Sequence, residues 1–418
     1  MPAYRSELLN VLDQRHYTHQ ITDAERLDFL ASEQIVPGYV GFDPTAPSLH
    51  VGNMVQIMLL RRLQQTGHKP IVVMGGGTGK VGDPSGRDET RQLMTDEVIA
   101  ANIASQRPVF ERLLTFGDGP TDAVIVNNDE WLSGLGYLEL LRDIGPHFTI
   151  NRMLTFDSVK SRLDREQPLT FLEFNYMILQ AYDFRELAER YGCRLQMGGS
   201  DQWGNIVNGI ELTRRTGGDE LFGFTTPLVT TADGKKMGKT ASGAVWLNED
   251  RLPAYDFWQF WRNTDDRDVG RFLRLFTDIP LDEISRLEGL EGAEINDAKI
   301  ALADAATTML HGEHAALEAK ASAAAVFQQG STGEALPTFD ITKSEIEAGY
   351  LAAAGFSLAG LTKSNGEARR SIKQNAAKVN GAVVTDENAV ISLSDFDEEG
   401  VVTLSIGKKR HARLQLTD

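Results

Sequence analysis

Residues 44–53 read Pro-Thr-Ala-Pro-Ser-Leu-His-Val-Gly-Asn and join a predicted strand to a predicted helix. The strand is the run at 38–42, and the helix follows from apolar residues between 51 and 59 that recur at helical spacing. Ser48 occupies the position expected of the helix N-cap. Because a helix N-terminus presents unpaired N–H groups and the positive end of its dipole, this stretch predicts a phosphate site above the strand.

Two side chains of the first helical turn, those of His50 and Asn53, are three residues apart and therefore project to the same side. Gly52 lies between them without a side chain, so a flat group such as a purine can lie against the backbone. A single histidine at a helix start is also an ordinary structural residue. The phosphate hypothesis therefore needs a second motif elsewhere in the chain.

The composition is that of a folded protein of several domains. The chain has 418 residues, of which 41% are hydrophobic and 24% charged, and this length predicts two or three domains. A single cysteine, Cys193, excludes an internal disulfide framework and a metal site built on several cysteines. The sequence shows no targeting signal and no apolar run long enough to span a membrane, so we expect a cytoplasmic protein.

The negative charge is concentrated in the front of the chain. The net charge is −17, whereas residues 361–418 carry nine Lys/Arg and eight Asp/Glu, so residues 1–360 carry −18. A polyanion can therefore still bind at the C-terminal end. The basic residues predicted to contact such a polyanion are Lys363, Arg369, Arg370, Lys373 and Lys378.

Residues 69–77 form the next predicted strand, and residues 77–82 then match the G-x-G-x-x-G pattern of dinucleotide-binding folds. The match is misleading, because the Asp-Pro-Ser-Gly turn at 83–86 breaks the helix that the pattern requires. Lys80 is followed by valine, which also excludes a phosphate-binding P-loop. We therefore expect neither an NAD nor an FAD site.

A further strand is predicted at 123–127 and a long helix at 171–190. Between them, residues 131–156 read as an insertion or as a subunit contact. One face of the long helix is polar, which is typical either of a solvated surface or of one wall of a polar pocket. The residues of this polar stripe are Tyr176, Gln180 and Asp183.

Two later strands end in residues suited to a ligand. Residues 193–197 lead into Gly-Gly-Ser-Asp at 198–201, where the glycines permit a close backbone approach and Asp201 can accept from hydroxyl groups. Residues 221–231 lead into a loop at 233–240 that carries three lysines and two glycines. This loop reads as a basic surface turn or as a mobile loop that closes on a polyphosphate.

The remaining segments divide the chain into domains. Residues 252–329 show a helical, Ala-rich pattern, and the following Gly-Ser-Thr-Gly stretch is typical of a linker. The predicted division is an α/β domain at 1–240, a helical domain at 241–329, a linker at 330–346 and a small C-terminal domain at 347–418.

Both phosphate motifs resemble those of one enzyme family. Residues 49–53, Leu-His-Val-Gly-Asn, resemble the HIGH motif of class I aminoacyl-tRNA synthetases, and residues 236–240, Lys-Met-Gly-Lys-Thr, resemble their KMSKS loop. More narrowly, the chain resembles the bacterial tyrosyl-tRNA synthetases nearly from end to end. The other matching segments are 39–46, 82–86, 176–183 and 198–205.

The resemblance implies a Rossmann-like parallel-sheet catalytic domain, a helical domain that contacts tRNA, a small α+β RNA-binding domain and a homodimer. It implies that tyrosine and ATP form tyrosyl-adenylate and pyrophosphate, after which the tyrosyl group passes to the 3′-terminal ribose of tRNA. Since the substrate carboxylate is the nucleophile, catalysis depends on placement and charge stabilisation. Mg²⁺ is expected with ATP, and no protein ligands for a metal can be identified.

The resemblance also assigns roles by position. The catalytic residues around the triphosphate are Thr45, His50, Asn53, Lys236, Lys239 and Thr240, with Arg87 and Arg91 as helpers. The ATP site further includes Asp43, Gly52, Gly199 and Asp201. The tyrosine ammonium is assigned to Asp83, Tyr176 and Gln180, its carboxylate to Gln202, and its phenolic hydroxyl to Tyr39 and Asp183.

The chain departs from the family motifs in three ways. Asn53 replaces the last histidine of HIGH, although an amide still donates to phosphate oxygens. Gly238 and Thr240 replace the two serines of KMSKS, a form also found in this family. Arg87 stands where some members have lysine, which keeps the charge and changes its geometry.

Two other functions remain as alternatives. A tryptophanyl-tRNA synthetase has the nearest fold, but is not expected to carry the C-terminal RNA-binding segment or the pair of Tyr39 and Asp183. An RNA-binding protein that kept the fold and lost catalysis is not expected to keep both phosphate motifs.

Overall fold

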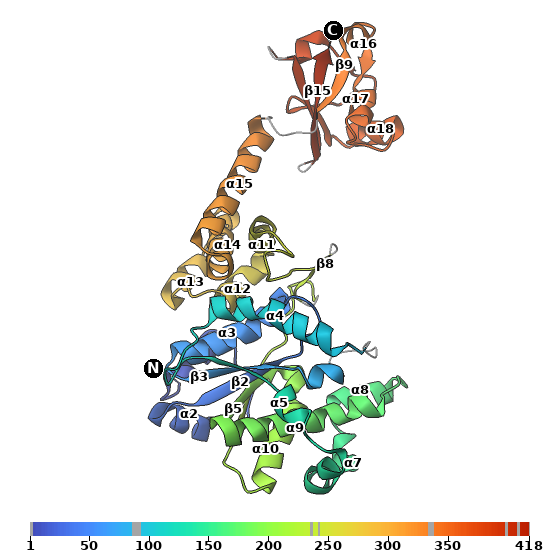
Figure 1. The fold of residues 1–418 in the computed structure, drawn as a ribbon. Coiled ribbons are helices and arrows are strands. Elements are labelled where there is room, and N and C mark those ends of the chain that lie inside the picture. Colours follow the sequence, from blue (N-terminus) through green and yellow to red (C-terminus); the bar gives the residue numbers. More distant parts are fainter. Residues whose placement is uncertain are drawn as a thin grey trace. The chain divides into compact units, whose positions relative to one another are not determined.

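The computed structural model describes residues 3–85, 93–234, 237–240, 243–332, 338–397, 400–407 and 410–417. It divides into two compact units, Met1–Ala319 and Lys320–Asp418, each of which is described by itself (Figure 1). Among the described residues, no helix is long and apolar enough to cross a membrane.

The first unit contains a six-stranded sheet in the order β1-β6-β5-β2-β3-β4. The strands pair in parallel, except that β1 at one edge runs antiparallel to β6. The direction in which the chain winds reverses between β2 and β5, and ligands of such sheets bind where that reversal opens a crevice at the carboxyl ends. The strands are β1 (Gln20–Ile21), β2 (Pro37–Phe42), β3 (Lys69–Met74), β4 (Val124–Asn127), β5 (Leu195–Gly199) and β6 (Phe222–Thr226).

Helices cover both faces of this sheet, which confirms the predicted α/β class. In Figure 1, α3 (Val51–Gln65) and α4 (Asp96–Leu113) lie over one face, and α9 (Phe171–Tyr191) and α10 (Trp203–Arg215) over the other. The short strands β2 and β3 are buried because both faces are covered. The remaining helices of this part are α1 (Glu7–Gln14), α2 (Ala24–Glu33), α5 (Asp129–Leu132), α6 (Tyr137–Glu139), α7 (Ile150–Met153) and α8 (Asp157–Asp164).

A helical part completes the first unit. Its core is aromatic: the Trp261 ring lies 4.9 Å from that of Phe276 and 6.1 Å from that of Phe272. Arg62, at the end of α3, is buried and donates to Asp278 Oδ1 at 2.5 Å, which joins this part to the sheet domain. The helices are α11 (Ala254–Arg262), α12 (Val269–Phe276), α13 (Leu281–Glu288), α14 (Ile295–His311) and the start of α15 (Glu313–Thr332), which continues past the end of this unit at Ala319.

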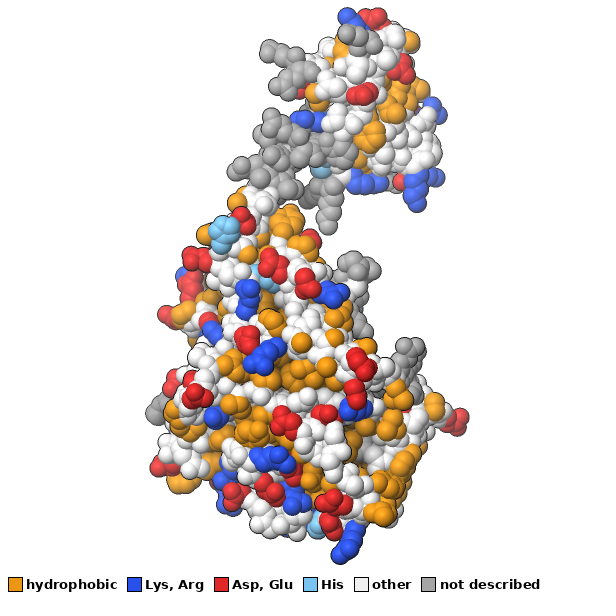
Figure 2. Space-filling view, viewed as in Figure 1, with side chains coloured by type: hydrophobic (Ala, Val, Ile, Leu, Met, Phe, Trp, Pro, Cys, Tyr) orange, Lys and Arg blue, Asp and Glu red, His pale blue; other side chains and the backbone are white. Residues whose placement is uncertain are grey.

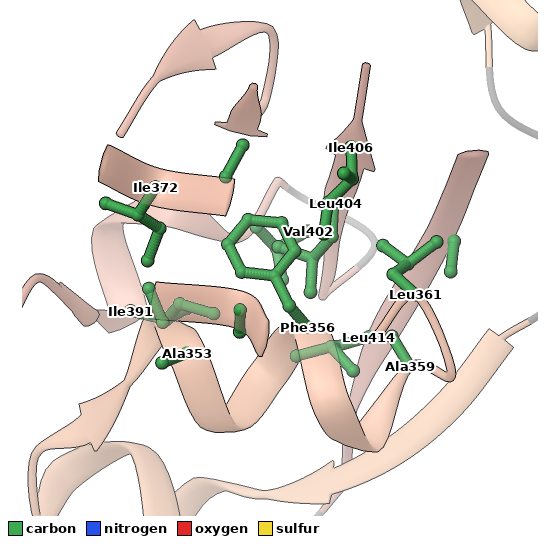
Figure 3. Close-up of a cluster of buried hydrophobic side chains, with 14 of the residues drawn as sticks. Ala353, Phe356, Ala359, Leu361, Ile372, Ile391, Val402, Leu404, Ile406 and Leu414 are labelled. Atoms are coloured by element: carbon green, nitrogen blue, oxygen red, sulfur yellow. The ribbon is translucent and has the colours of Figure 1, made fainter. Parts of the chain in front are cut away.

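The C-terminal unit has a sheet and a core of its own. Figure 3 shows Phe356 between the sheet, represented by Leu404 and Leu414, and Ile372 of α18. The sheet order is β12-β11-β14-β15-β9. Its elements are β9 (Thr338–Thr342), α16 (Lys343–Glu347), α17 (Ala352–Leu358), α18 (Asn365–Lys373), β11 (Ala377–Val379), β12 (Ala382–Val383), β14 (Val401–Ile406) and β15 (Arg410–Thr417), with a separate pair β10 (Tyr350–Leu351) and β13 (Val390–Ile391).

The linker predicted at 330–346 is wrong over its second half. Residues 338–342 form β9, which pairs in parallel with β15, and α16 follows directly. The sequence hid this strand because its only fully buried apolar residue is Ile341, so it lacks the apolar run of a central strand. The C-terminal unit therefore includes residues that we assigned to the linker.

Candidate active site

A cavity of about 760 Å³ opens at the carboxyl ends of β2 and β5. This is the crevice at which the winding of the sheet reverses. The predicted site residues that line it are Tyr39, Asp43, Thr45, His50, Gly52, Asn53, Asp83, Tyr176, Gln180, Asp183, Gly199, Asp201 and Gln202. Segments that are far apart in the sequence thus meet at one cavity.

One end of the cavity combines a buried carboxylate with a buried hydroxyl. Asp183 of α9 is 3% exposed, and its two oxygens accept from Asn128 Nδ2 at 2.9 Å and from Trp131 Nε1 at 2.7 Å. Burial raises the pKa of the Asp183 carboxyl to about 7, although both donors act to lower it. The Tyr39 hydroxyl is buried and has no hydrogen-bond partner among the described residues. This end of the cavity therefore offers a buried carboxylate and a buried hydroxyl to a ligand.

Asn128 and Trp131 are site residues that the sequence reasoning missed. Asn128 follows the carboxyl end of β4, where a polar residue after a parallel strand is the same signal that identified Asp201. Trp131 carried no such signal, because it belongs to the short helix α5 and its partner Asp183 is 52 residues away in the chain.

Asp43 also lines the cavity and accepts two side-chain hydrogen bonds. Its Oδ2 accepts from the Tyr176 hydroxyl at 3.0 Å and its Oδ1 from Thr78 Oγ1 at 2.8 Å. Burial and the carboxylates of Asp43 and Asp83 raise the pKa of Tyr176 well above its ordinary value, so this hydroxyl remains a donor. A Cβ at Gly75 would clash with Asp43 Oδ1, which only glycine avoids.

A chain of amides runs along the neighbouring wall. Gln202 Nε2 donates to Asp83 Oδ2 at 2.8 Å, and Gln180 Nε2 donates to Gln202 Oε1 at 3.3 Å. Asn205 Nδ2 donates to Gln180 Oε1 at 2.9 Å and orients that side chain. Asn205 lies in the matching segment 198–205, but the resemblance gave it no role of its own. Together these groups present several acceptors to the cavity, which suits an ammonium group.

The helix α3 begins later than the predicted cap implies. Its N-cap is His50, whose backbone N–H donates to Asn53 Oδ1 at 3.1 Å, and the predicted cap Ser48 is wrong. Ser48 is buried and donates instead to Asn248 Oδ1 at 2.6 Å. Leu49 cannot be helical, because its carbonyl accepts from the Leu247 N–H at 2.8 Å in an extended arrangement.

The two phosphate motifs are in contact at the start of α3. A Cβ at Gly52 would lie 3.0 Å from the Met237 carbonyl oxygen, and one at Gly238 would lie 2.8 Å from the Gly52 nitrogen. Gly238 has a φ of +88°, so glycine is favoured there for its backbone as well. The loop is further joined to the helix through Val245, whose carbonyl accepts from Val51 at 2.9 Å and whose N–H donates to Gly238 at 3.0 Å.

For some predicted site residues the structure gives no side-chain position. Lys236, Arg87 and Arg91 lie outside the described residues. For Lys239 and Thr240 the structure describes the backbone, which forms β7 (Lys239–Thr240) and pairs with β8 (Gly243–Ala244). Within the described part of the chain, no group of three or more His, Cys, Asp or Glu is arranged to hold a metal ion.

Comparison with known proteins places this chain in a family. Residues 33–328 match the family described as tRNA synthetases class I (W and Y). The tyrosine–tRNA ligase of Novosphingobium aromaticivorans is 65% identical over 99% of this chain and 100% of its own length, and that of Rhodospirillum rubrum is 60% identical over 100% and 99%. The chain belongs to the tyrosine–tRNA ligases of this family.

Solved structures of such ligases have the same fold. A C-terminally truncated mitochondrial tyrosyl-tRNA synthetase of Aspergillus nidulans is 31% identical, with a TM-score of 0.69 over 77% of this chain and 94% of that one. The tyrosyl-tRNA synthetase of Archaeoglobus fulgidus, solved with L-tyrosine, is 20% identical with a TM-score of 0.55 over 75% and 99%, and shows the fold alone.

Membership of the tyrosine–tRNA ligases decides between the alternatives raised by the sequence. The chain is an aminoacyl-tRNA synthetase, so the hypothesis of a non-catalytic RNA-binding protein is set aside. The tryptophanyl hypothesis is set aside too, because the relatives that cover nearly the whole chain are tyrosine–tRNA ligases.

Proposed function

We propose that this chain joins tyrosine to ATP at the cavity, forming tyrosyl-adenylate and pyrophosphate, and transfers the tyrosyl group to the 3′-terminal ribose of tRNA. A carboxylate oxygen of tyrosine attacks the α-phosphorus, and the bond to the β-phosphate oxygen breaks. The observation that carries this proposal is the Asp183 carboxylate, oriented by two donors in the same cavity as the Tyr39 hydroxyl, for which the described part of the chain supplies no partner. A phenolic hydroxyl entering there donates to Asp183 and pairs with Tyr39.

The opposite end of the tyrosine side chain meets the polar wall. The ammonium group lies among Asp83, Tyr176 and Gln180, whose oxygens accept its three N–H bonds. Gln202 holds the carboxylate, and its bond to Asp83 fixes the direction of its amide. The nucleophilic oxygen is thereby directed toward the N-terminus of α3, and this placement accounts for much of the rate.

The phosphates lie at the start of α3, where His50, Asn53 and Thr45 surround them and the helix dipole favours negative charge. Lys236, Lys239 and Thr240 act on the departing pyrophosphate. Asp201 accepts from the ribose hydroxyls. A Cβ at Gly199 would lie 2.7 Å from Asp201 Oδ1, so a glycine at 199 leaves room for this carboxylate. Mg²⁺ would arrive with ATP, held mainly by phosphate oxygens.

The C-terminal unit binds the tRNA backbone. Helix α18 carries Arg370 and Lys373 in its last turn, and Figure 2 shows Lys and Arg side chains gathered over this helix. Arg369, Lys363 and Lys378 add positive charge to the same unit. Neutralising phosphates with such residues supplies most sequence-independent affinity for nucleic acid.

A homodimer and a cytoplasmic location complete the proposal. Large apolar side chains are exposed on the segment between β4 and the first turn of α9, and an apolar surface of this kind is typical of a subunit contact. This segment includes the region that the sequence read as an insertion or subunit contact. The exposed residues are Tyr137, Leu138, Leu141, Ile150, Leu154, Leu163, Phe171 and Leu172.

Tyrosine-dependent exchange of pyrophosphate into ATP tests the activity directly. We expect exchange with tyrosine, and at most trace exchange with phenylalanine or tryptophan at the same concentration. Exchange with tryptophan in preference to tyrosine, or with neither, would contradict the proposal. Sedimentation of Leu138→Glu beside the wild type tests the dimer, because a charge in that surface is expected to produce monomers.

A further inference from the structure

The loop that leads to the lysine motif is held by the helical part as well as by α3. The Ala232 N–H donates to Asp268 Oδ2 at 2.7 Å. Arg271 Nη2 donates to the Thr230 carbonyl oxygen and to Asp268 Oδ1, the latter at 2.6 Å. Arg271 of α12 and the N-cap residue Asp268 therefore bind two backbone groups of the loop, the Thr230 carbonyl and the Ala232 N–H. We call Asp268 and Arg271 the loop anchor.

The loop anchor is more than a surface ion pair. Asp268 is 3% exposed, and a carboxylate buried to that degree requires a partner for each oxygen. One oxygen is used by Arg271 and the other by the loop. The guanidinium also lies 5.1 Å from the centre of the Phe272 ring, which limits its rotation. Asp268 is thus fixed by burial, whereas the Arg271 side chain, 38% exposed, is held by its hydrogen bonds and by the Phe272 ring.

A backbone hydrogen bond connects the residues near Ala232 to the lysine motif. The Met237 N–H donates to the Val229 carbonyl oxygen at 3.1 Å, so the two arms of the loop are joined directly beside the anchored residues. Met237 is buried, and the next residue is Gly238, which contacts the start of α3. The anchor and the α3 contact therefore hold opposite sides of the same loop.

We propose that Asp268 and Arg271 are positioning residues for adenylate formation, holding the lysine motif at the phosphate end of the cavity. This inference rests on the proposed function. Charges that stabilise a departing pyrophosphate act only when they are placed accurately, so loosening one side of the loop lowers the rate of the chemical step. The anchor contacts none of the residues assigned to tyrosine, and tyrosine binding does not depend on it.

The test uses pyrophosphate exchange and equilibrium binding of tyrosine with the full chain. Asp268→Ala removes both bonds, and we expect kcat to fall roughly tenfold, equivalent to about 1.4 kcal/mol, with the Kd for tyrosine changed less than about twofold. Asp268→Asn keeps an oxygen for the Ala232 N–H and loses the charge that pairs with Arg271. We expect this conservative variant to recover a large part of the lost rate.

The matched control is Asp266→Ala. Asp266 belongs to the same short turn before α12, but it is exposed and pairs with Lys299 at 2.5 Å within the helical part. We expect wild-type kinetics from this control. Melting temperatures of all variants identify any that fail to fold, and Asp268→Asn preserves the test if Asp268→Ala is one of them.

The outcomes separate this inference from the proposed function. An active wild type whose Asp268→Ala and Asp268→Asn variants match Asp266→Ala in kcat overturns the loop anchor alone. A parallel loss of tyrosine affinity and kcat also overturns it, since the anchor would then support the whole cavity. A wild type without tyrosine-dependent exchange overturns the proposed function, and the loop anchor with it.

Discussion

At the scale of single residues, we expect the Tyr39 hydroxyl to contribute to the preference for tyrosine over phenylalanine. Tyr39→Phe keeps the ring, which packs edge-on against Phe184 at 5.3 Å, and removes one partner of the substrate hydroxyl. For a hydrogen bond of about 1.4 kcal/mol, we expect the ratio of kcat/KM for tyrosine to that for phenylalanine to fall roughly tenfold. An unchanged ratio would remove Tyr39 from the hydroxyl site.

The test compares the ratio of kcat/KM values in the variant with that in the wild type. The absolute degree of discrimination therefore need not be known. Tyr182→Phe is a suitable control, since Tyr182 lies on the same helix next to Asp183 and does not line the cavity. We expect its discrimination ratio to equal that of the wild type.

The sequence could predict most residues of the cavity and not the network that orients them. Tyr39, Tyr176 and Asp183 stand in segments that match a known family, so a resemblance identifies them. Asn128 follows a predicted strand, so its place at the edge of the sheet could be predicted, but its bond to Asp183 could not. Trp131 also acts by bonding Asp183, and its position follows from the docking of α5, which no local pattern contains. Long-range hydrogen bonds of this kind appear only when the chain is folded.

At the scale of elements, the contact between the lysine loop and α3 requires a glycine at position 238. Gly238→Ser adds a Cβ 2.8 Å from the Gly52 nitrogen at a φ of +88°, so the loop must move away from the phosphate end. We expect a fall of about tenfold or more in the rate of pyrophosphate exchange, with tyrosine affinity retained. Stopped-flow measurement of adenylate formation distinguishes the two quantities.

A substitution at a second glycine of the same region distinguishes the effect of backbone strain from that of a steric clash. Gly243 has a φ of +122°, but a Cβ there meets no described atom within 4 Å. Gly243→Ser therefore introduces strain without the clash, and we expect it to lower the exchange rate much less than Gly238→Ser does. Equal losses in both variants would show that strain alone accounts for the effect.

The pairing of α11 with α14 depends on pH through His311. Burial against Phe257, whose ring centre is 4.9 Å away, lowers the pKa of His311 from 6.5 to about 4. Because the unfolded chain binds a proton near pH 6.5 and the folded chain does not, stability is complete above pH 6.5 and is lost as the pH falls toward 4. We expect the melting temperature to fall over this range.

Replacing the titrating group tests that assignment. His311→Phe cannot be protonated, so the fall in melting temperature between about pH 6.5 and 4.5 is expected to become smaller. His314→Gln is the control, because His314 is 87% exposed on α15 and should leave the pH dependence unchanged. If both variants follow the wild type, carboxylates elsewhere govern the acid sensitivity.

At the scale of the whole molecule, we expect adenylate formation not to require the C-terminal unit. Its sheet and its buried cluster around Phe356 are formed within residues 338–417, and the cavity is lined by residues of the first unit alone. Ending the chain after residue 337 should leave pyrophosphate exchange within about twofold of wild type and lower tRNA charging by about tenfold or more. Equal loss of both activities would mean that this unit supports the fold of the first.

The sequence was informative about this division, and its error was local. The Gly-Ser-Thr-Gly stretch near residue 330 indicates a linker before a separate C-terminal domain. The start of that domain was misplaced because β9 is an edge strand with little apolar character, recognisable only by its pairing with β15.

The two ends of the cavity are built by different elements, and this has an evolutionary consequence. The hydroxyl end is formed by β2, α5 and α9, whereas the phosphate end is formed by the start of α3 and the lysine loop. Mutations that reshape the first can therefore accumulate while the second continues to activate whatever amino acid is bound. In an ancestor with this architecture, substitutions at one end would change the amino-acid preference while the residues that act on the phosphates at the other end stayed the same.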